Sequence, residues 1–213
     1  MCIRDSYMAR LTRDLRYFAL AESDPAGVLK WMNRAVSDSG QDHIFVTLIY
    51  VVLDAKNKLA TIVNAGHMPP ILRNRREGEV VSLDKVSGLP LGVLPDTEYE
   101  AETLELRPGD SMMLYTDGLV EAMNPQQEML GIERLTEILG QGSSDANTLL
   151  VRAVQACQKH VVDAPQFDDT TIVCLGLDAD TATQDIIVPK EVRGGADEAR
   201  IEAMLRIRNI KPD

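Results

Sequence analysis

The stretch from Ser111 to Asn124, SMMLYTDGLVEAMN, constrains the fold more than any other part of the chain. Its apolar run Met112–Tyr115 follows the turn residues 107–110, RPGD, as expected for a buried strand. The run stops at Asp117 and Gly118, a carboxylate followed by the residue that lets the chain turn sharply and approach a ligand closely. The sequence therefore predicts a strand that ends in an acid at the mouth of a sheet.

A second acidic position precedes another predicted strand. Asp168 and Asp169 belong to the segment 167–171, FDDTT, which stands directly before the apolar strand Ile172–Leu177. Two strands that each carry an acid at one end can bring their carboxylates together, and paired hard oxygen ligands suit Mg²⁺ or Mn²⁺. Either motif alone is weak evidence, because an Asp-Gly pair after a strand is most often a simple turn.

The composition excludes several classes of protein. The chain has 22 Lys and Arg residues against 33 Asp and Glu residues, a net charge of −11, so it lacks the basic surplus with which nucleic-acid binders displace counterions. No run of 18 apolar residues occurs, and no membrane-spanning helix is expected. The three Cys and three His residues lack the spacings of a disulfide framework or a zinc site. We therefore expect a cytoplasmic globular protein whose chain contacts neither nucleic acid nor membrane.

Periodicity and turn residues divide the chain into helices and strands. Helical patterns with one apolar face cover Tyr7–Ala21, Pro25–Ser37, Gly131–Leu139 and Asp145–Val162. Strand patterns cover Ile44–Leu53, Leu59–Asn64, Ile71–Asn74, Val80–Leu83, Tyr99–Leu106, Met112–Tyr115 and Thr171–Leu177. The run Ile44–Leu53 is almost continuously apolar, which predicts a central strand covered on both faces.

The domain organisation follows from shifts in composition. Residues 1–6, MCIRDS, have no signal-peptide pattern and are interpreted as a sequence-assembly artefact. We expect residues 7–178 to form the compact unit. Residues 179–213 are polar, with a charged helical pattern near the end, and are either a docking tail or the truncated start of another domain.

Five motifs, in this order and spacing, resemble the metal-dependent protein phosphatase (PPM) family in its bacterial SpoIIE/RsbU-type branch. They are FVTLIYVVLD, NAGHMPP, GLPLGV, LRPGDSMMLYTDGLVEA and FDDTTIV. The resemblance covers about Ala9–Leu177 and implies an α+β fold, an antiparallel β-sandwich flanked by helices. It also implies a protein serine/threonine phosphatase with two Mn²⁺ or Mg²⁺ ions in a carboxylate cleft.

The resemblance carries roles to individual residues. It implies that Asp117 and Asp168 are metal ligands and that Gly118, Asp169 and His67 support the site. For His67 an equally good alternative is a ring that simply bonds the backbone at a corner. The implied substrate is a phosphorylated regulatory protein of the anti-sigma-factor antagonist type. The parent protein can still be tethered to a membrane through an N-terminal region.

One part of the family pattern is missing. The family opens with a hairpin that carries an aspartate and a Gly-Asp-x-x-Gly-His-Gly motif whose aspartate bridges both metals, and this chain has no such sequence. We therefore expect an N-terminally truncated domain that is itself inactive, from a parent that is a phosphatase. The alternatives are a phosphatase-like module that binds a partner without catalysis, and a regulatory domain whose residues 179–213 dock a partner kinase.

Overall fold

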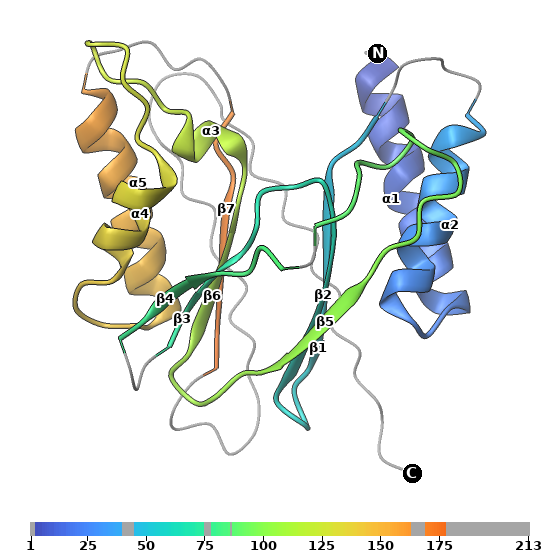
Figure 1. The fold of residues 1–213 in the computed structure, drawn as a ribbon, viewed down its shortest axis with the longest axis horizontal. Coiled ribbons are helices and arrows are strands. Elements are labelled where there is room, and N and C mark those ends of the chain that lie inside the picture. Colours follow the sequence, from blue (N-terminus) through green and yellow to red (C-terminus); the bar gives the residue numbers. More distant parts are fainter. Residues whose placement is uncertain (1–2, 40–44, 75–77, 86, 163–168, 178–213) are drawn as a thin grey trace. The chain divides into compact units, whose positions relative to one another are not determined.

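The computed structural model describes residues 3–39, 45–74, 78–85, 87–162 and 169–177, with side chains from residue 7 onward (Figure 1). These residues fall into two compact units, each considered by itself: unit 1 holds residues up to 67 and 85–105, and unit 2 holds 68–84 and the described residues from 106 onward. The predicted tail 179–213 lies outside the described residues. Within them, no helix is both long and apolar enough to cross a bilayer.

The helix pair of unit 1 is formed by α1 (Ile3–Ala21) and α2 (Pro25–Ser37). The bounds predicted for α2 are confirmed, because Asp24 caps the helix by accepting hydrogen bonds from the backbone N–H groups of Ala26 and Gly27 at 3.2 and 3.3 Å. Helix α1 starts earlier than the predicted Tyr7 and includes residues 3–6. Its end, Ala21, is as predicted.

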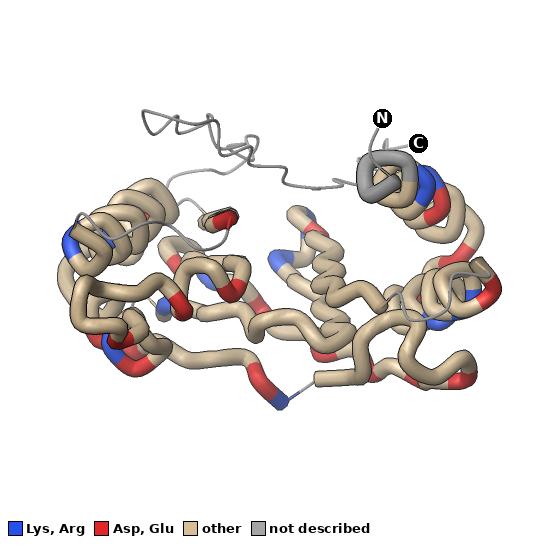
Figure 2. The backbone as a smooth tube through the Cα atoms, turned by 90° about the horizontal axis from the view of Figure 1, so that it is seen from above, with Lys and Arg blue, Asp and Glu red and all other residues tan. Residues whose placement is uncertain are grey.

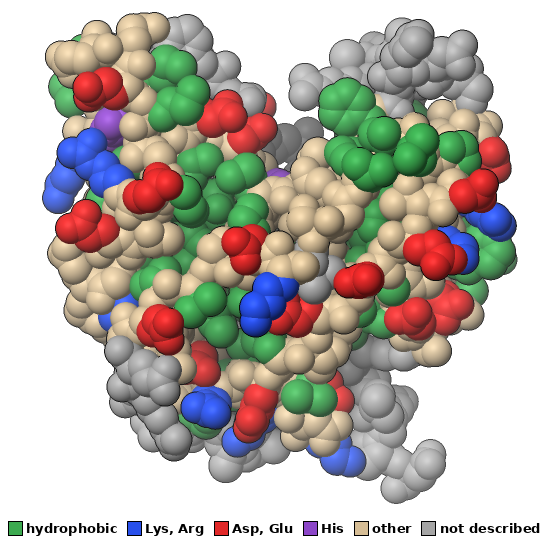
Figure 3. All heavy atoms as spheres, in the orientation of Figure 1, with side chains coloured by type: hydrophobic (Ala, Val, Ile, Leu, Met, Phe, Trp, Pro, Cys, Tyr) green, Lys and Arg blue, Asp and Glu red, His purple; other side chains and the backbone are tan. Residues whose placement is uncertain are grey.

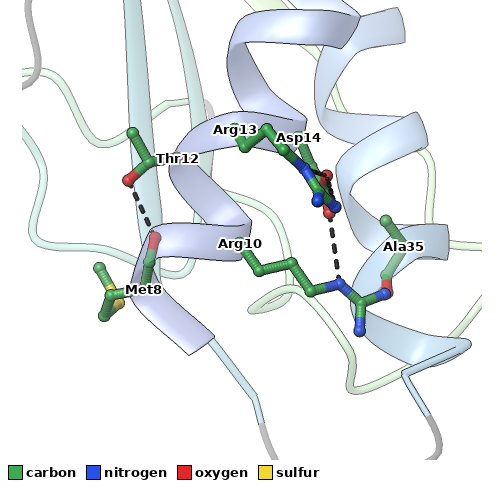
Figure 4. Close-up of polar contacts among 6 residues, drawn as sticks. All are labelled: Met8, Arg10, Thr12, Arg13, Asp14 and Ala35. Carbon is green, nitrogen blue, oxygen red and sulfur yellow. Dashed lines mark hydrogen bonds and ion pairs between the residues drawn. The ribbon is translucent and has the colours of Figure 1, made fainter. Parts of the chain in front are cut away.

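Polar contacts lie on the surface of α1, and one of them reaches α2 (Figure 4). Asp14 forms ion pairs with Arg10 at 3.4 Å and with Arg13 at 2.8 Å, and Arg10 also donates to the carbonyl oxygen of Ala35 on α2 at 3.5 Å. Exposed ion pairs of this kind contribute little to stability. The helices are therefore held mainly by the apolar side chains between them and the sheet, which include Leu11, Leu15, Val28, Leu29, Met32 and Val63.

Some apolar side chains of these helices stay at the surface. Tyr17 and Leu20 are 67% exposed and Trp31 is 47% exposed. Trp31 stacks on Phe18 with ring centroids 6.3 Å apart, and the Arg34 guanidinium lies 5.9 Å from the Trp31 ring. Figure 3 shows hydrophobic side chains exposed on this unit. Trp31 therefore flanks the buried stripe of α2, which contains Val28, Leu29, Met32 and Val36.

The sheet of unit 1 has the order β1 (Leu48–Asp54), β2 (Leu59–Ala65) and β5 (Ala101–Glu105), all antiparallel. Strands β1 and β2 lie in two segments that the sequence predicts to be strands, and they form a hairpin. The prediction that Ile44–Leu53 forms a central strand is wrong: among the described strands β1 lies at an edge, and each of its residues is only half-buried. A continuous apolar run predicts burial, but it does not indicate whether a strand pairs with one neighbouring strand or with two.

A buried amide fixes the loop that contains Gly92, Leu94 and Pro95. Asn33 of α2 is fully buried, and its Nδ2 donates to the carbonyl oxygens of Leu94 and Pro95 at 2.7 and 2.9 Å. Its Oδ1 accepts from the N–H of Gly92 at 2.8 Å. One side chain therefore satisfies three backbone groups of a loop about 60 residues away, as buried polar groups require.

The sheet of unit 2 has the order β4 (Val80–Ser82), β3 (Ile71–Arg73), β6 (Ser111–Tyr115) and β7 (Ile172–Gly176), again antiparallel. Strand β6 is paired on both sides, and four of its five residues are buried. The predicted burial of SMMLY is therefore confirmed. The antiparallel pairing of β6 with β7 joins segments that are about 60 residues apart in the chain.

The described residues of unit 2 form three helices: α3 (Asp117–Val120), α4 (Ile132–Leu139) and α5 (Ala146–Val161). Helices α4 and α5 match the predicted segments within a residue, and Asp145 caps α5 by accepting from the Thr148 N–H at 2.8 Å. Helix α3 was not predicted. The helices share a core with the sheet, formed by Met113, Leu119, Leu135, Leu139, Leu149, Ala153 and Cys174, with Cys157 packed against it. Both cysteines thus pack against apolar side chains.

Tyr115, the last residue of β6, gives a testable dependence of stability on pH. Its hydroxyl is buried and has no hydrogen-bond partner among the described residues, and burial raises the pKa of Tyr115 to about 12 from an ordinary value near 10. The unfolded chain loses this proton near pH 10, whereas the folded chain keeps it until about pH 12. The folded state therefore loses stability as the pH rises through this window, and not below it.

Tyr115→Phe should raise the free energy of unfolding by about 1 kcal/mol at pH 8, because it removes a buried hydroxyl that lacks a partner. The difference in free energy of unfolding between the variant and the original protein should grow between pH 10 and 12, because the variant lacks the loss of stability that Tyr115 causes through this window. Urea unfolding at pH 10 and at pH 12 measures the difference. Tyr99→Phe is the matched control: burial also raises the pKa of Tyr99 to about 12, but its hydroxyl donates to the Leu89 carbonyl oxygen at 3.1 Å. Tyr99→Phe should therefore lower the free energy of unfolding at pH 8. Equal effects of the two substitutions at pH 8 would contradict the conclusion that the Tyr115 hydroxyl lacks a partner.

Candidate functional site

The predicted acid Asp117 lies where β6 ends and α3 begins. Thr116 is in an extended conformation, with φ −88° and ψ 161°, and Asp117 is the first residue of the short helix. One carboxylate oxygen, Oδ1, accepts the Gly118 N–H at 2.9 Å, while the Asp117 side chain is exposed and Gly118 is buried. The structure therefore presents a carboxylate to solvent at the end of a buried central strand, as the sequence predicts.

The described part of the predicted second acidic segment, from Asp169 onward, lies directly beside this turn. The backbone N–H of Thr116 donates to the Thr171 carbonyl oxygen at 3.0 Å, which extends the ladder of β6 and β7 beyond the Tyr115–Ile172 pair. The Thr116 hydroxyl accepts the Thr171 N–H at 2.9 Å and donates to the Asp169 carbonyl oxygen at 3.2 Å. The ends of the two strands are thus joined by three hydrogen bonds, all made by one residue.

Gly118 allows this junction because it has no side chain. A Cβ atom at this position would lie 2.5 Å from the Asp169 carbonyl oxygen, closer than Cβ atoms essentially ever lie to another atom, and 3.1 Å from the Asp169 carbonyl carbon, which is also tight. Its φ is not in the left-handed region, so space rather than backbone conformation requires the glycine. The sequence predicts that this glycine lets the backbone approach a ligand. Within the described residues, the structure shows that it makes room for the backbone of Asp169.

Of the two acids in the second segment, the structure describes Asp169 but not Asp168. The Asp169 side chain is exposed at the junction, beside the turn that carries Asp117. Asp168 lies outside the described residues, so its convergence with Asp117 stays a prediction.

His67 lies in unit 1, at the corner after β2. Its backbone N–H donates to Asn64 Oδ1 at 2.8 Å, and Asn64 Nδ2 donates to the His67 carbonyl oxygen at 3.0 Å, so the buried Asn64 amide closes the corner. The imidazole is half-buried. Because the two units are described separately, a role for His67 beside Asp117 stays a prediction.

The part of the chain that the structure describes does not complete a metal centre. Within residues 3–162 and 169–177, apart from the gaps named above, no three His, Cys, Asp or Glu side chains gather closely enough to hold an ion. Asp117 and Asp169 supply carboxylates at the junction, but a Mg²⁺ or Mn²⁺ pair needs more oxygen ligands than these. Figure 2 shows acidic positions spread over both units.

Two residues that organise these segments were not predicted from the sequence. Thr116 ties the ends of β6 and β7, and Asn64 closes the corner before His67. A threonine before an Asp-Gly pair can be read as a helix cap, but Thr116 makes no side-chain cap bond and contacts another strand instead. No local pattern indicates that partner.

Comparisons with known proteins agree with this architecture. The family described as Stage II sporulation protein E (SpoIIE) matches residues 6–178. Protein IcfG of Synechocystis sp. is 32% identical over 139 residues, 65% of this chain and 22% of IcfG. Phosphoserine phosphatase RsbU of Bacillus subtilis is 24% identical over 151 residues, 71% of this chain and 44% of RsbU. The chain therefore spans less than half of each of these relatives.

A solved structure shows the same fold. The SiaA-PP2C domain of Pseudomonas aeruginosa superposes with a TM-score of 0.67 and 21% identity, covering 83% of this chain and 72% of that one. The two antiparallel sheets with their helices are thus those of a PPM phosphatase domain, an α+β fold. Because the family match covers most of the chain, this protein belongs to the SpoIIE family of PP2C-type (PPM) phosphatase domains.

Proposed function

We propose that this chain is part of a protein serine/threonine phosphatase that hydrolyses phosphoserine or phosphothreonine on a regulatory protein of the anti-sigma-factor antagonist type. The family match and the name of RsbU, a phosphoserine phosphatase, support this proposal. The structural observation that carries it is the junction of β6 and β7, where an exposed Asp117 stands beside the backbone of Asp169. Such a substrate is a cytosolic protein, so we expect the reaction in the cytoplasm.

The proposed site uses divalent cations held by Asp117 and Asp168. Two proteins of similar fold support metal dependence: the SpoIIE phosphatase domain of Bacillus subtilis described as Mn presoaked, at a TM-score of 0.56, and RsbX in complex with magnesium, at 0.55. When bound, Mn²⁺ or Mg²⁺, two ions in the complete domain, would supply Lewis-acid stabilisation of the phosphoryl group.

The protein's own residues would prepare this site. The Gly118 N–H holds one oxygen of the Asp117 carboxylate and so limits its rotation. Gly118 admits the Asp169 backbone, and Asp169 and His67 have supporting roles in the proposal. Because the chain has no Gly-Asp-x-x-Gly-His-Gly sequence, it lacks the bridging carboxylate of the family pattern. We expect little turnover by these 213 residues alone.

The test is a phosphatase assay with a phosphoserine peptide and with p-nitrophenyl phosphate. It compares the 213-residue chain with a form that also contains the Gly-Asp-x-x-Gly-His-Gly segment, each with Mn²⁺ and with EDTA. The expected result is Mn²⁺-dependent hydrolysis by the form with that segment and little by the chain alone. Clear turnover by the chain alone would overturn its expected inactivity. Hydrolysis by neither form, with no heat of Mn²⁺ binding in calorimetry, would favour a non-catalytic partner-binding module.

A further inference from the structure

We propose that Thr116 is a positioning residue whose hydroxyl holds the backbone of Asp169–Thr171 against the turn that carries Asp117. As far as it concerns metal, this inference rests on the proposed function. The hydrogen-bonding role itself does not, because it follows from contacts between described residues.

The geometry gives one hydroxyl two different tasks. Its oxygen accepts the Thr171 N–H at 2.9 Å, and its hydrogen is donated to the Asp169 carbonyl oxygen at 3.2 Å. The regular ladder of β6 and β7 ends at the Tyr115–Ile172 pair. Beyond that pair the Thr116 side chain forms hydrogen bonds with two backbone groups of the residues that precede β7. It therefore extends the pairing of the two chain segments into the turn.

The hydrogen bond from Thr116 to Asp169 lies where a small shift of the Asp169 backbone would reach the Asp117 carboxylate. The Asp169 carbonyl oxygen that accepts the hydroxyl is the same atom that packs against Gly118. Gly118 N–H in turn holds the Asp117 carboxylate. Thr116 therefore links the position of the Asp169 backbone to the position of the Asp117 carboxylate through groups in direct contact.

The chemistry predicts which side chains can replace Thr116. Serine keeps a hydroxyl at the same atom and can both donate and accept. Valine has nearly the same shape but no hydroxyl, so it leaves the Thr171 N–H and the Asp169 carbonyl without this partner. Groups that orient metal ligands typically change metal affinity 10–100-fold when they are removed.

The first readout does not depend on metal. In the 213-residue chain, Thr116→Val should speed hydrogen exchange of the Thr171 amide by about tenfold, the factor that corresponds to the net loss of one hydrogen bond of ordinary strength. Thr116→Ser should stay close to the original protein. If valine distorts the turn, shown by a changed circular dichroism spectrum, Thr116→Ala repeats the comparison with a smaller side chain. Unchanged exchange in a folded hydroxyl-free variant would overturn the proposal.

The second readout is Mn²⁺ affinity by calorimetry, in the form of the protein that shows Mn²⁺-dependent turnover. Thr116→Val should weaken binding at least about tenfold, and Thr116→Ser should restore it. The matched control is Thr61→Val in unit 1, which removes a comparable cross-strand hydroxyl contact, 2.9 Å to Thr103, and should leave Mn²⁺ affinity unchanged.

These outcomes separate the two proposals. Faster exchange with unchanged Mn²⁺ affinity, or a serine variant that fails to restore both readouts, would overturn the positioning role while leaving the phosphatase proposal intact. If no form of the original protein binds Mn²⁺, the proposed function fails, and the exchange comparison alone decides whether Thr116 holds the Asp169–Thr171 backbone.

Discussion

Asp117→Asn should lower Mn²⁺-dependent phosphatase activity by at least about 100-fold while leaving the protein folded. The loss is of the size found when one preorganised electrostatic contact is removed from a reaction centre. Asparagine keeps an oxygen that can accept the Gly118 N–H, now 2.9 Å from Asp117 Oδ1, so the turn should survive. What changes is the charge, because a neutral amide is a much poorer ligand for Mn²⁺ or Mg²⁺ than a carboxylate.

The measurement is turnover of the phosphoserine peptide in the form of the protein that hydrolyses it, together with the melting temperature. Glu137→Gln is the matched control: it removes the same charge from an exposed position on α4 in the same unit and should change turnover less than about twofold. Activity of Asp117→Asn within tenfold of the original protein would show that Asp117 is not a ligand.

Gly118→Ala should damage both stability and activity. The added methyl group would meet the Asp169 carbonyl oxygen at 2.5 Å, and a backbone atom cannot move aside as a flexible side chain can. We expect the ends of β6 and β7 to separate, a loss of about 2–3 kcal/mol in the free energy of unfolding of unit 2, and loss of turnover. Because Thr116 bonds the same Asp169 carbonyl oxygen, amide exchange of Thr171 should also become faster.

Gly78→Ala is the control that separates space from backbone conformation. Gly78 has φ +64° and no atom within 4 Å of an added Cβ, so alanine there meets no neighbour but adopts a left-handed backbone. Gly78→Ala should lower the free energy of unfolding by about 1–2 kcal/mol and leave turnover and Thr171 amide exchange unchanged. Denaturant unfolding and amide exchange test both variants. A Gly118→Ala protein that melts like the original and keeps its activity would refute the close packing at the junction.

The local elements could be predicted from the sequence because their signals lie within a few residues of each other. Asp24 with Pro25 marks the start of α2, and the cap at Asp145 marks the start of α5. The apolar run before Asp117 marks β6. Caps, turns and periodicity act through contacts between near neighbours in the chain, so they are readable before any tertiary structure exists.

The motifs around Asp117 and His67 also identified the family before the fold was known. The match to residues 6–178 confirms that identification. The ligand roles of Asp117 and Asp168 are still predictions, since residue 168 lies outside the described part of the chain.

Other features depended on which distant segments meet. The apolar run of β1 predicts burial, yet among the described strands β1 is an edge, because the number of neighbours of a strand is set by the topology of the sheet. Gly118 reads as a turn glycine, but its need for space comes from the Asp169 backbone about 50 residues later. The hydroxyl of Thr116 meets its partners only once β7 pairs with β6. Such contacts form between residues far apart in the chain, and no local pattern of residue types encodes them.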